Sequence, residues 1–281
     1  MPIRLIALDL DGTLLNSQSE ISAANREALQ KTAELGVETV IVTGRRFHSA
    51  RPVVAPLPCA LTLISSNGAR IGNLEGEACH RDFLPVRLAR EALKTAASFR
   101  RFAVLMHDLP GRGQVTMQQG GSLEGPLSWY RRNSPDALLE VPDLEAALGL
   151  NNPDPIQVMF GGPPVEIEPV GCVLATSPIA SSVQLTWTQY PLRNTVLLDV
   201  MNRNCTKGAA LRLWAARRGI TRAEVMAIGD NLNDREMLKF AGLPVVMANA
   251  EPGVCCDGWA RTLSNDEDGV AAALHRYVID V

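Results

Sequence analysis

The chain has 281 residues, of which 46% are hydrophobic and 20% are charged, and its formal net charge is −3. This is enough apolar material for one large domain or two smaller ones, and the charge argues against a general binder of nucleic acids or membrane surfaces, which usually carries a basic excess. Because the sequence has no long apolar run, no signal-peptide layout and no C-x-x-C pair, we expect no membrane span and a cytoplasmic location.

The first part of the chain predicts strands that alternate with a helix. Residues 3–8, 37–42 and 61–65 are short apolar runs that predict buried strands, and residues 22–35 have the apolar spacing of a helix. A strand–helix–strand order is typical of a parallel sheet, in which ligands bind beyond the carboxyl ends of the strands. Each predicted strand is followed by polar residues, so we expect the functional site there.

The middle of the chain predicts an inserted α+β domain over residues 83–190. The expected elements are a helix over residues 85–99 and strands over residues 102–107, 114–118, 155–160 and 183–188. We expect the hinges near residues 81–85 and 189–193, where Pro191 and polar residues cluster.

The strand and helix pattern returns after the insertion. Helices are predicted over residues 206–218, 233–240 and 268–278, and strands over residues 225–228 and 243–247. We therefore expect an α/β protein with a Rossmann-like parallel-sheet core, formed by residues 1–82 and 191–281 and interrupted by the inserted domain.

The clearest motif follows the first predicted strand. Asp9 and Asp11 lie two residues apart, and Gly12 permits a tight turn that can aim both carboxylates at one site. Two adjacent carboxylates repel each other, and a bound cation or a proton on one of them relieves the repulsion.

The second motif is Thr43, Gly44 and Arg45, at the end of the next strand. A hydroxyl and backbone amides there can hold a phosphoryl group, although such a threonine is often only a helix cap. Arg45 could bind an anion, or it could be a solvated surface arginine.

Two further motifs lie in the last third of the chain. Lys207 opens a helix, where backbone amides already favour anions, although a solvent-facing lysine is the ordinary alternative. Asp230, Asn233 and Asp234 follow another strand, and oxygen donors packed this closely suit a hard cation such as Mg²⁺. With the two earlier motifs they supply a nucleophile, an acid/base, a cation and metal ligands, which together can transfer a phosphoryl group.

These four strings, in this order, resemble the motifs of the haloacid dehalogenase superfamily. The long insertion resembles its class II type B cap, and two further strings, Ser66 to Ala69 and Asn265 to Ala271, resemble its Cof-like phosphatases. The resemblance implies a phosphatase with a hydrolase core and an inserted cap.

The resemblance also implies a role for each motif residue. Asp9 would be the nucleophile and Asp11 the acid/base. Asp9, the backbone carbonyl of Asp11 and Asp230 would bind Mg²⁺. The remaining predicted residues hold the phosphoryl group, namely Thr43, Gly44, Arg45, Asn67, Lys207 and Asn233, with Asp234 supporting them from behind.

The sequence leaves the substrate open. We expect a small phosphate ester, such as a sugar phosphate, and no nucleic-acid or membrane partner; the oligomeric state (monomer or homodimer) is not predicted. A phosphomutase, a binding module without catalysis and a phosphatase for macromolecules are the alternatives. Candidate specificity residues in the insertion are Arg112, Gln118, Trp187 and Arg193, although Trp187 is of a type more often found in a core.

Overall fold

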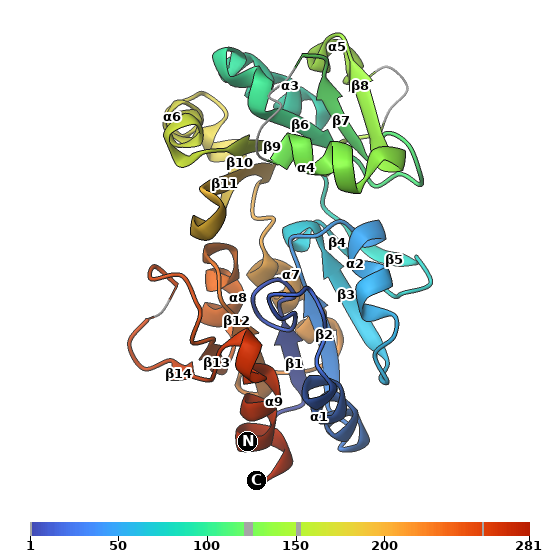
Figure 1. The fold of residues 1–281 in the computed structure, drawn as a ribbon, viewed down its shortest axis with the longest axis vertical. Coiled ribbons are helices and arrows are strands. Elements are labelled where there is room, and N and C mark those ends of the chain that lie inside the picture. The colour runs from blue at the N-terminus through green and yellow to red at the C-terminus, as the bar shows by residue number, and fades with distance from the viewer. Residues whose placement is uncertain (1, 121–125, 150–152, 255) are drawn as a thin grey trace. The chain divides into compact units, whose positions relative to one another are not determined.

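The computed structural model describes residues 2–120, 126–149, 153–254 and 256–281. It divides the chain into two compact units (Figure 1). The core unit consists of Met1–Arg81 and Thr206–Val281, and the inserted unit of Asp82–Cys205. The expected α/β fold, in which an α+β segment interrupts a parallel-sheet core, is confirmed.

The core unit is built on a sheet with the strand order β14-β13-β12-β1-β2-β3-β4-β5. Its parallel strands are β1 (Leu5–Leu8), β2 (Glu38–Val42), β3 (Leu61–Ser65), β12 (Val225–Gly229), β13 (Leu243–Val246) and β14 (Ala260–Arg261). The antiparallel pair β4 (Arg70–Gly72) and β5 (Ala78–Arg81) forms one edge. The central strand β1 is fully buried, which explains its continuous apolar run.

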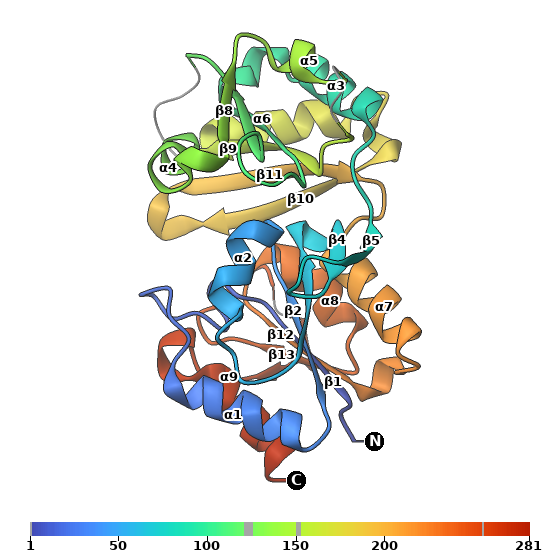
Figure 2. The same cartoon turned by 90° about the vertical axis from the view of Figure 1, so that its right-hand side faces the viewer.

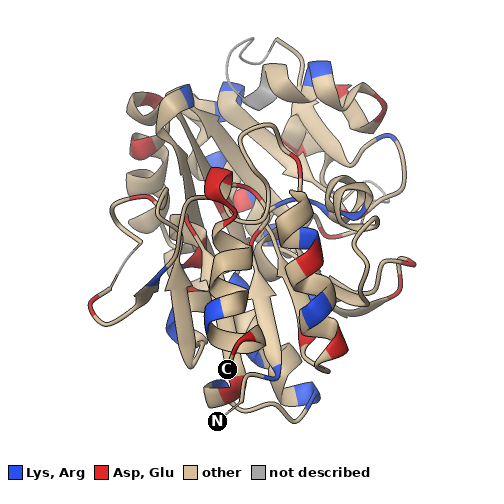
Figure 3. Cartoon of the chain, turned by 60° about the horizontal axis from the view of Figure 1, so that its bottom comes forward, with Lys and Arg blue, Asp and Glu red and all other residues tan. Residues whose placement is uncertain are grey.

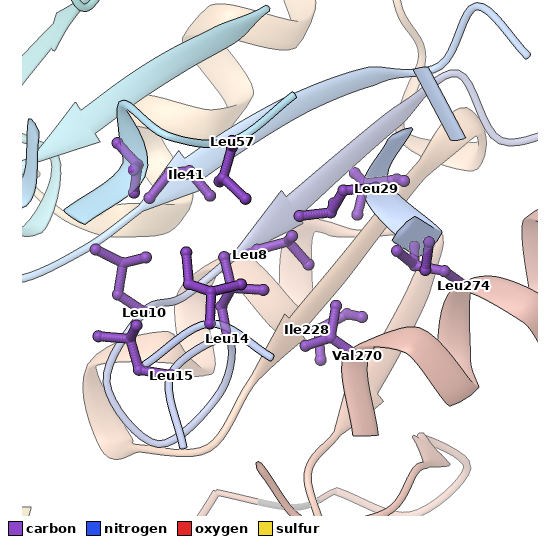
Figure 4. Close-up of a cluster of buried hydrophobic side chains, with 14 of the residues drawn as sticks. Leu8, Leu10, Leu14, Leu15, Leu29, Ile41, Leu57, Ile228, Val270 and Leu274 are labelled. Carbon is purple, nitrogen blue, oxygen red and sulfur yellow. The ribbon is translucent and has the colours of Figure 1, made fainter. Parts of the chain in front are cut away.

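Helices cover both faces of this sheet (Figure 2). One face packs against α1 (Ala23–Glu34), α2 (Phe47–Val54) and α9 (Gly269–Leu274), and the other against α7 (Lys207–Arg217) and α8 (Arg235–Phe240). Figure 4 shows part of the first interface, where Leu8, Ile41 and Ile228 of neighbouring strands lie with Leu29 of α1 and Leu274 of α9. Burial of these side chains holds the sheet, and therefore the ends of its strands, in a rigid frame.

The inserted unit has its own sheet with the strand order β10-β11-β9-β6-β7-β8. The strands are β6 (Ala103–Met106), β7 (Val115–Gln118), β8 (Leu138–Val141), β9 (Gln157–Gly162), β10 (Val183–Tyr190) and β11 (Thr195–Asn202). Its helices are α3 (Val86–Thr95), α4 (Pro126–Asn133), α5 (Leu144–Ala147) and α6 (Pro164–Ala175). One hydrophobic cluster joins α3, α5 and α6 to one face of the sheet, so this unit has a core of its own.

The inserted unit ends later than the sequence predicted. The expected boundary lay between residues 190 and 191, whereas the structure places it between Cys205 and Thr206. The reason is β11, which pairs with β9 and β10 and so belongs to the inserted sheet. The expected hinge at 189–193 is instead the turn between β10 and β11. At the other boundary the structure divides the chain between Arg81 and Asp82, one residue from the expected position.

None of the helices in the described ranges is long and apolar enough to cross a membrane. In Figure 3, the Lys and Arg residues coloured along the ribbon are interspersed with Asp and Glu. This mixture matches the small net charge of −3.

Candidate active site

Three predicted site residues follow three neighbouring strands of the core sheet. Asp9 follows β1, Thr43 follows β2 and Asp230 follows β12. Since β1 lies between β2 and β12 and pairs with both in parallel, the three residues leave the sheet at the same edge. All three are buried.

Lys207 joins two of the predicted carboxylates. Its side chain is fully buried, and Nζ donates to Oδ1 of Asp9 at 2.7 Å and to Oδ1 of Asp234 at 2.6 Å. Gly208 lets α7 pack closely against α8, because a Cβ at residue 208 would lie 2.3 Å from the backbone oxygen of Glu236 in α8. The solvent-facing alternative for Lys207 is therefore excluded.

The loop after β12 is folded around Asp234. Oδ2 of Asp234 accepts the backbone N–H groups of Asp230 and Asn231, each at 3.0 Å, while its Oδ1 accepts from Lys207. Asp230 is oriented in turn by Thr13, whose hydroxyl donates to its Oδ1 at 2.8 Å. Thr13 was not among the predicted site residues, although it lies in the first motif.

The carboxylates of Asp9, Asp230 and Asp234 can supply ligand atoms that lie within 4.8 Å of one another. Both oxygens of Asp234 are already engaged, which leaves Oδ2 of Asp9 and Oδ2 of Asp230 without a hydrogen bond to the described residues. Gly12, with φ +81°, makes room for this second oxygen, since a Cβ there would come within 2.3 Å of it. Carboxylate oxygens of two buried residues that accept no hydrogen bond from the described residues fit a hard cation.

The electrostatics of the cluster support the same conclusion. Burial, together with the neighbouring carboxylate of Asp234, raises the pKa of Asp9 to about 7 and also raises the pKa of Asp230. Burial acts to lower the pKa of Lys207, but the carboxylates of Asp234 and Asp9 raise it above its ordinary value. One ammonium therefore faces three buried carboxyl groups, and a divalent cation would offset the remaining negative charge.

Asn67 contacts residues of both the second motif (Gly44) and the fourth motif (Asn233). Oδ1 of Asn67 accepts from Nδ2 of Asn233 at 3.0 Å, and a Cβ on Gly44 would lie 3.2 Å from that oxygen. Asn67 has a φ of 53°, a left-handed conformation that asparagine tolerates better than most residues. The hydroxyl of Thr43 accepts the N–H of Arg45 at 3.1 Å. The structure thus brings these predicted residues together in the core unit, and it places the guanidinium of Arg45 against Asp11.

Two asparagines that were not among the predicted site residues hold the turn of the first motif. Nδ2 of Asn249 donates to the carbonyl of Gly12 at 2.8 Å, and Nδ2 of Asn265 donates to the carbonyl of Leu15 at 2.9 Å. The N–H of Asn265 also donates to Oδ1 of Asn249 at 3.0 Å. Asn265 begins one of the strings that suggested the family, whereas Asn249 carried no local signal.

The candidate residues of the inserted unit do not form a cluster. Trp187 is partly buried and packs on α6 against the hydrophobic cluster, since a Cβ on Gly171 would come within 2.3 Å of its ring. Arg112 and Arg193 are exposed, and Gln118 is partly buried.

The sequence model of the family of haloacid dehalogenase-like hydrolases matches residues 6–114 and 184–274 of this chain. The chain belongs to this family. The match covers both parts of the core unit and the two ends of the inserted unit. The expected membership is thereby confirmed, and the predicted roles of the motif residues remain predictions.

Curated relatives of this haloacid dehalogenase-like hydrolase are phosphatases. It is 31% identical to phosphatase YwpJ of Bacillus subtilis, over 96% of this chain and 98% of the relative. It is 30% identical to the HMP-PP phosphatase of Serratia proteamaculans, over 89% of this chain and 85% of the relative. The expected class of enzyme, a phosphatase, is confirmed.

Solved structures show the same fold. A haloacid dehalogenase-like hydrolase from Bacteroides thetaiotaomicron superposes with a TM-score of 0.77 at 30% identity, covering 98% of this chain and 99% of that one. One from B. subtilis has a TM-score of 0.81 at 26% identity, covering 98% of this chain and all of the other.

Proposed function

We propose that this phosphatase depends on Mg²⁺ and hydrolyses small phosphorylated metabolites through an aspartyl-phosphate on Asp9. The observation that carries the proposal is the state of Asp9, a buried carboxylate at a strand end. Its Oδ1 is held by the ammonium of Lys207, and its Oδ2 makes no hydrogen bond with the described residues. An oriented carboxylate with one unoccupied oxygen is suited to attack phosphorus.

In the proposed reaction, one carboxylate oxygen of Asp9 bonds to phosphorus as the ester P–O bond breaks, its other oxygen would serve the cation, and Asp11 gives its proton to the leaving oxygen. Asp11 then takes a proton from water as that water attacks the phosphorus of the aspartyl-phosphate. Inorganic phosphate leaves, and Asp9 regains its carboxylate. One carboxyl group serves as acid and then as base, which balances the protons over the cycle.

The other predicted residues hold the phosphoryl group. In this proposal Thr43, Gly44 and Asn67 contribute from the first half of the core unit, and Lys207 and Asn233 from the second half. Arg45 is a further predicted contact, although its guanidinium is engaged with Asp11. Donors held in place before the substrate binds lower the cost of reorganisation in the transition state.

The proposed Mg²⁺ ligands are Asp9, the backbone carbonyl of Asp11 and Asp230. When bound, the cation would neutralise charge between the anionic nucleophile and the phosphate. Asp234 supports these ligands by fixing the backbone of Asp230 and the ammonium of Lys207.

The proposed substrates are small phosphate esters, with sugar phosphates as the first class to test. The relatives include an HMP-PP phosphatase and a 5-amino-6-(5-phospho-D-ribitylamino)uracil phosphatase, which is 29% identical over 99% of this chain. Both names describe small phosphorylated compounds. We place the enzyme in the cytoplasm, acting without nucleic-acid or membrane partners.

The test is hydrolysis of 4-nitrophenyl phosphate with Mg²⁺, with EDTA, and by Asp9→Asn. Asp257→Asn, at an exposed aspartate of the core unit, is the matched control. We expect turnover that needs the metal and Asp9 and that survives in the control. Mass spectrometry of acid-quenched wild type should show one added phosphoryl group, which is absent from Asp9→Asn.

Turnover by Asp9→Asn comparable to wild type would overturn the nucleophile assignment. Absence of turnover on aryl esters and on a panel of sugar phosphates would favour a phosphomutase or a binding module. Activation by a bisphosphate would then identify a mutase.

A further inference from the structure

Arg45 and Asp11 form a two-pronged ion pair at the edge of the proposed site. Nε of Arg45 donates to Oδ2 of Asp11 at 2.7 Å, and Nη2 donates to Oδ1 at 2.5 Å. A guanidinium that engages both oxygens of a carboxylate fixes its plane as well as its position, which a lysine ammonium does not do.

The backbone on both sides of this pair is anchored. The N–H of Arg45 donates to the hydroxyl of Thr43 at 3.1 Å, and the carbonyl of Arg45 accepts from the N–H of Ser66 at 2.8 Å. The carbonyl of Gly12, next to Asp11, accepts from Asn249 at 2.8 Å. The two-pronged ion pair of Arg45 and Asp11, called the fork below, therefore joins two strand ends that are each anchored by other hydrogen bonds. Its geometry is defined for that reason.

The pair is only partly buried, which limits its effect on stability. The side chain of Arg45 is 25% exposed to solvent and that of Asp11 is 38% exposed. Part-exposed ion pairs contribute about 0–1 kcal/mol to folding. The main consequence of the fork is therefore where it holds the carboxyl group.

The two aspartates of the first motif are assigned to different cations. The buried Lys207 forms an ion pair with Asp9, and the more exposed Arg45 forms an ion pair with Asp11. Without Arg45, the Asp11 side chain would be free to rotate through several rotamers at the site. Only some of these would put an oxygen within the reach that proton transfer requires.

We infer that Arg45 is a positioning residue for Asp11, which keeps the carboxyl group where it exchanges a proton with the leaving oxygen and then with water. The fork uses one lone pair on each carboxylate oxygen, and a second one on each remains for the proton. This inference rests on the proposed function, in which Asp11 is the acid and base.

The test uses the dependence of kcat/KM on the leaving group. This ratio reports the steps up to formation of the aspartyl-phosphate, and nitrophenolate leaves without a proton whereas a simple alkoxide needs one. The substrates are 4-nitrophenyl, phenyl and alkyl phosphates, and the variants are Arg45→Ala, Arg45→Lys and Asp11→Asn. Arg51→Ala, which removes an exposed arginine from α2, is the control.

We expect Arg45→Ala to lower kcat/KM on alkyl phosphates by about 10²-fold or more, and on 4-nitrophenyl phosphate by about tenfold or less. Asp11→Asn should show the same steepened dependence, and the double variant Arg45→Ala, Asp11→Asn should be little worse than Asp11→Asn alone. Arg45→Lys keeps the charge and loses the two-pronged contact, so its kcat/KM on alkyl phosphates should lie between the values of wild type and Arg45→Ala.

An equal loss on every ester would overturn the inference and assign Arg45 to the phosphoryl group. Unchanged kcat/KM on alkyl phosphates would also overturn it. If wild type hydrolyses no ester, the proposed function fails and this inference fails with it. Circular dichroism identifies a variant that does not fold, and Arg45→Lys then carries the comparison.

Discussion

The core unit and the inserted unit place their buried polar side chains differently. In the core unit the buried polar residues of the candidate site, such as Asp9, Thr43 and Asp230, lie just beyond the strand ends. In the inserted unit Gln157 and Asp199 lie within β9 and β11, where Nε2 of Gln157 donates to Oδ1 of Asp199 at 2.6 Å. A loop can concentrate polar residues into a recognisable string, whereas a strand separates them by alternation.

The polar residues of the inserted unit share one face of its sheet. Leu198 and Val200 pack into the hydrophobic cluster, so Asp199 between them points to the opposite face. Thr186 is paired directly with Asp199 across β10 and β11. The buried polar groups of the core site thus stand in short motifs after strand ends, whereas those named here in the inserted unit are brought together by strand register.

The largest expected effect on stability tests the buried ion cluster of the core unit. Lys207→Met leaves the carboxylates of Asp9 and Asp234 without their cation, and we expect a loss of about 3–5 kcal/mol in the free energy of unfolding. Urea unfolding in EDTA at pH 8 measures it. Lys239→Met removes a half-exposed lysine from α8 and should change stability by less than about 0.5 kcal/mol. A loss below about 1 kcal/mol for Lys207→Met would contradict the account of the cluster.

The next effect tests how closely the loop after β3 approaches α7. Gly68 has φ +107°, and a Cβ there would lie 2.4 Å from the carbonyl oxygen of Thr206. We expect Gly68→Ala to destabilise the protein by about 2–3 kcal/mol, from strain and collision together. Gly36→Ala is the control for strain alone, because it has φ +78° with no atom within 4 Å of a Cβ, and should cost about 1 kcal/mol. Equal losses in thermal unfolding would show that the close approach is unimportant.

A smaller effect tests the polar face of the inserted unit. Asp199→Ala leaves the amide of Gln157 without its buried acceptor, and we expect a loss of about 1–3 kcal/mol. Hydrogen exchange should show faster exchange in β9 and β11 and little change in β1 or β12. Asp136→Ala, at an exposed site, is the control. Uniformly faster exchange in both units would contradict their separate cores.

The smallest effect concerns Glu224 in the core unit. The hydroxyl and the N–H of Thr221, and then Arg4, lower the pKa of Glu224 from 4.5 to about 2. Because this pKa is depressed in the folded state, the stabilisation is complete above about pH 4.5 and is lost as the pH falls toward 2. The difference in unfolding midpoint between wild type and Glu224→Gln should therefore shrink below pH 4.5. A difference that stays constant down to pH 3, or an equal effect of Glu75→Gln, would contradict this.

Much of the core unit could be predicted from local patterns. The strands over 37–42 and 61–65 were expected from their apolar runs, and β2 and β3 occupy almost the same residues. Residues 191–205 were assigned to the core unit and no strand was predicted there, whereas β11 belongs to the inserted unit. The pairing of β11 with β9 and β10 assigns it to the inserted sheet, and strand pairing is a property of the folded chain.

The sequence by itself determined the family, the order of the core strands and helices, and the residue types at the strand ends, because each depends on neighbours along the chain. The tertiary structure decided which cation holds which carboxylate. Lys207 is 198 residues from Asp9, and Arg45 is 34 residues from Asp11. No local rule ranks such contacts, since they form only when the packed sheet and helices bring the strand ends together.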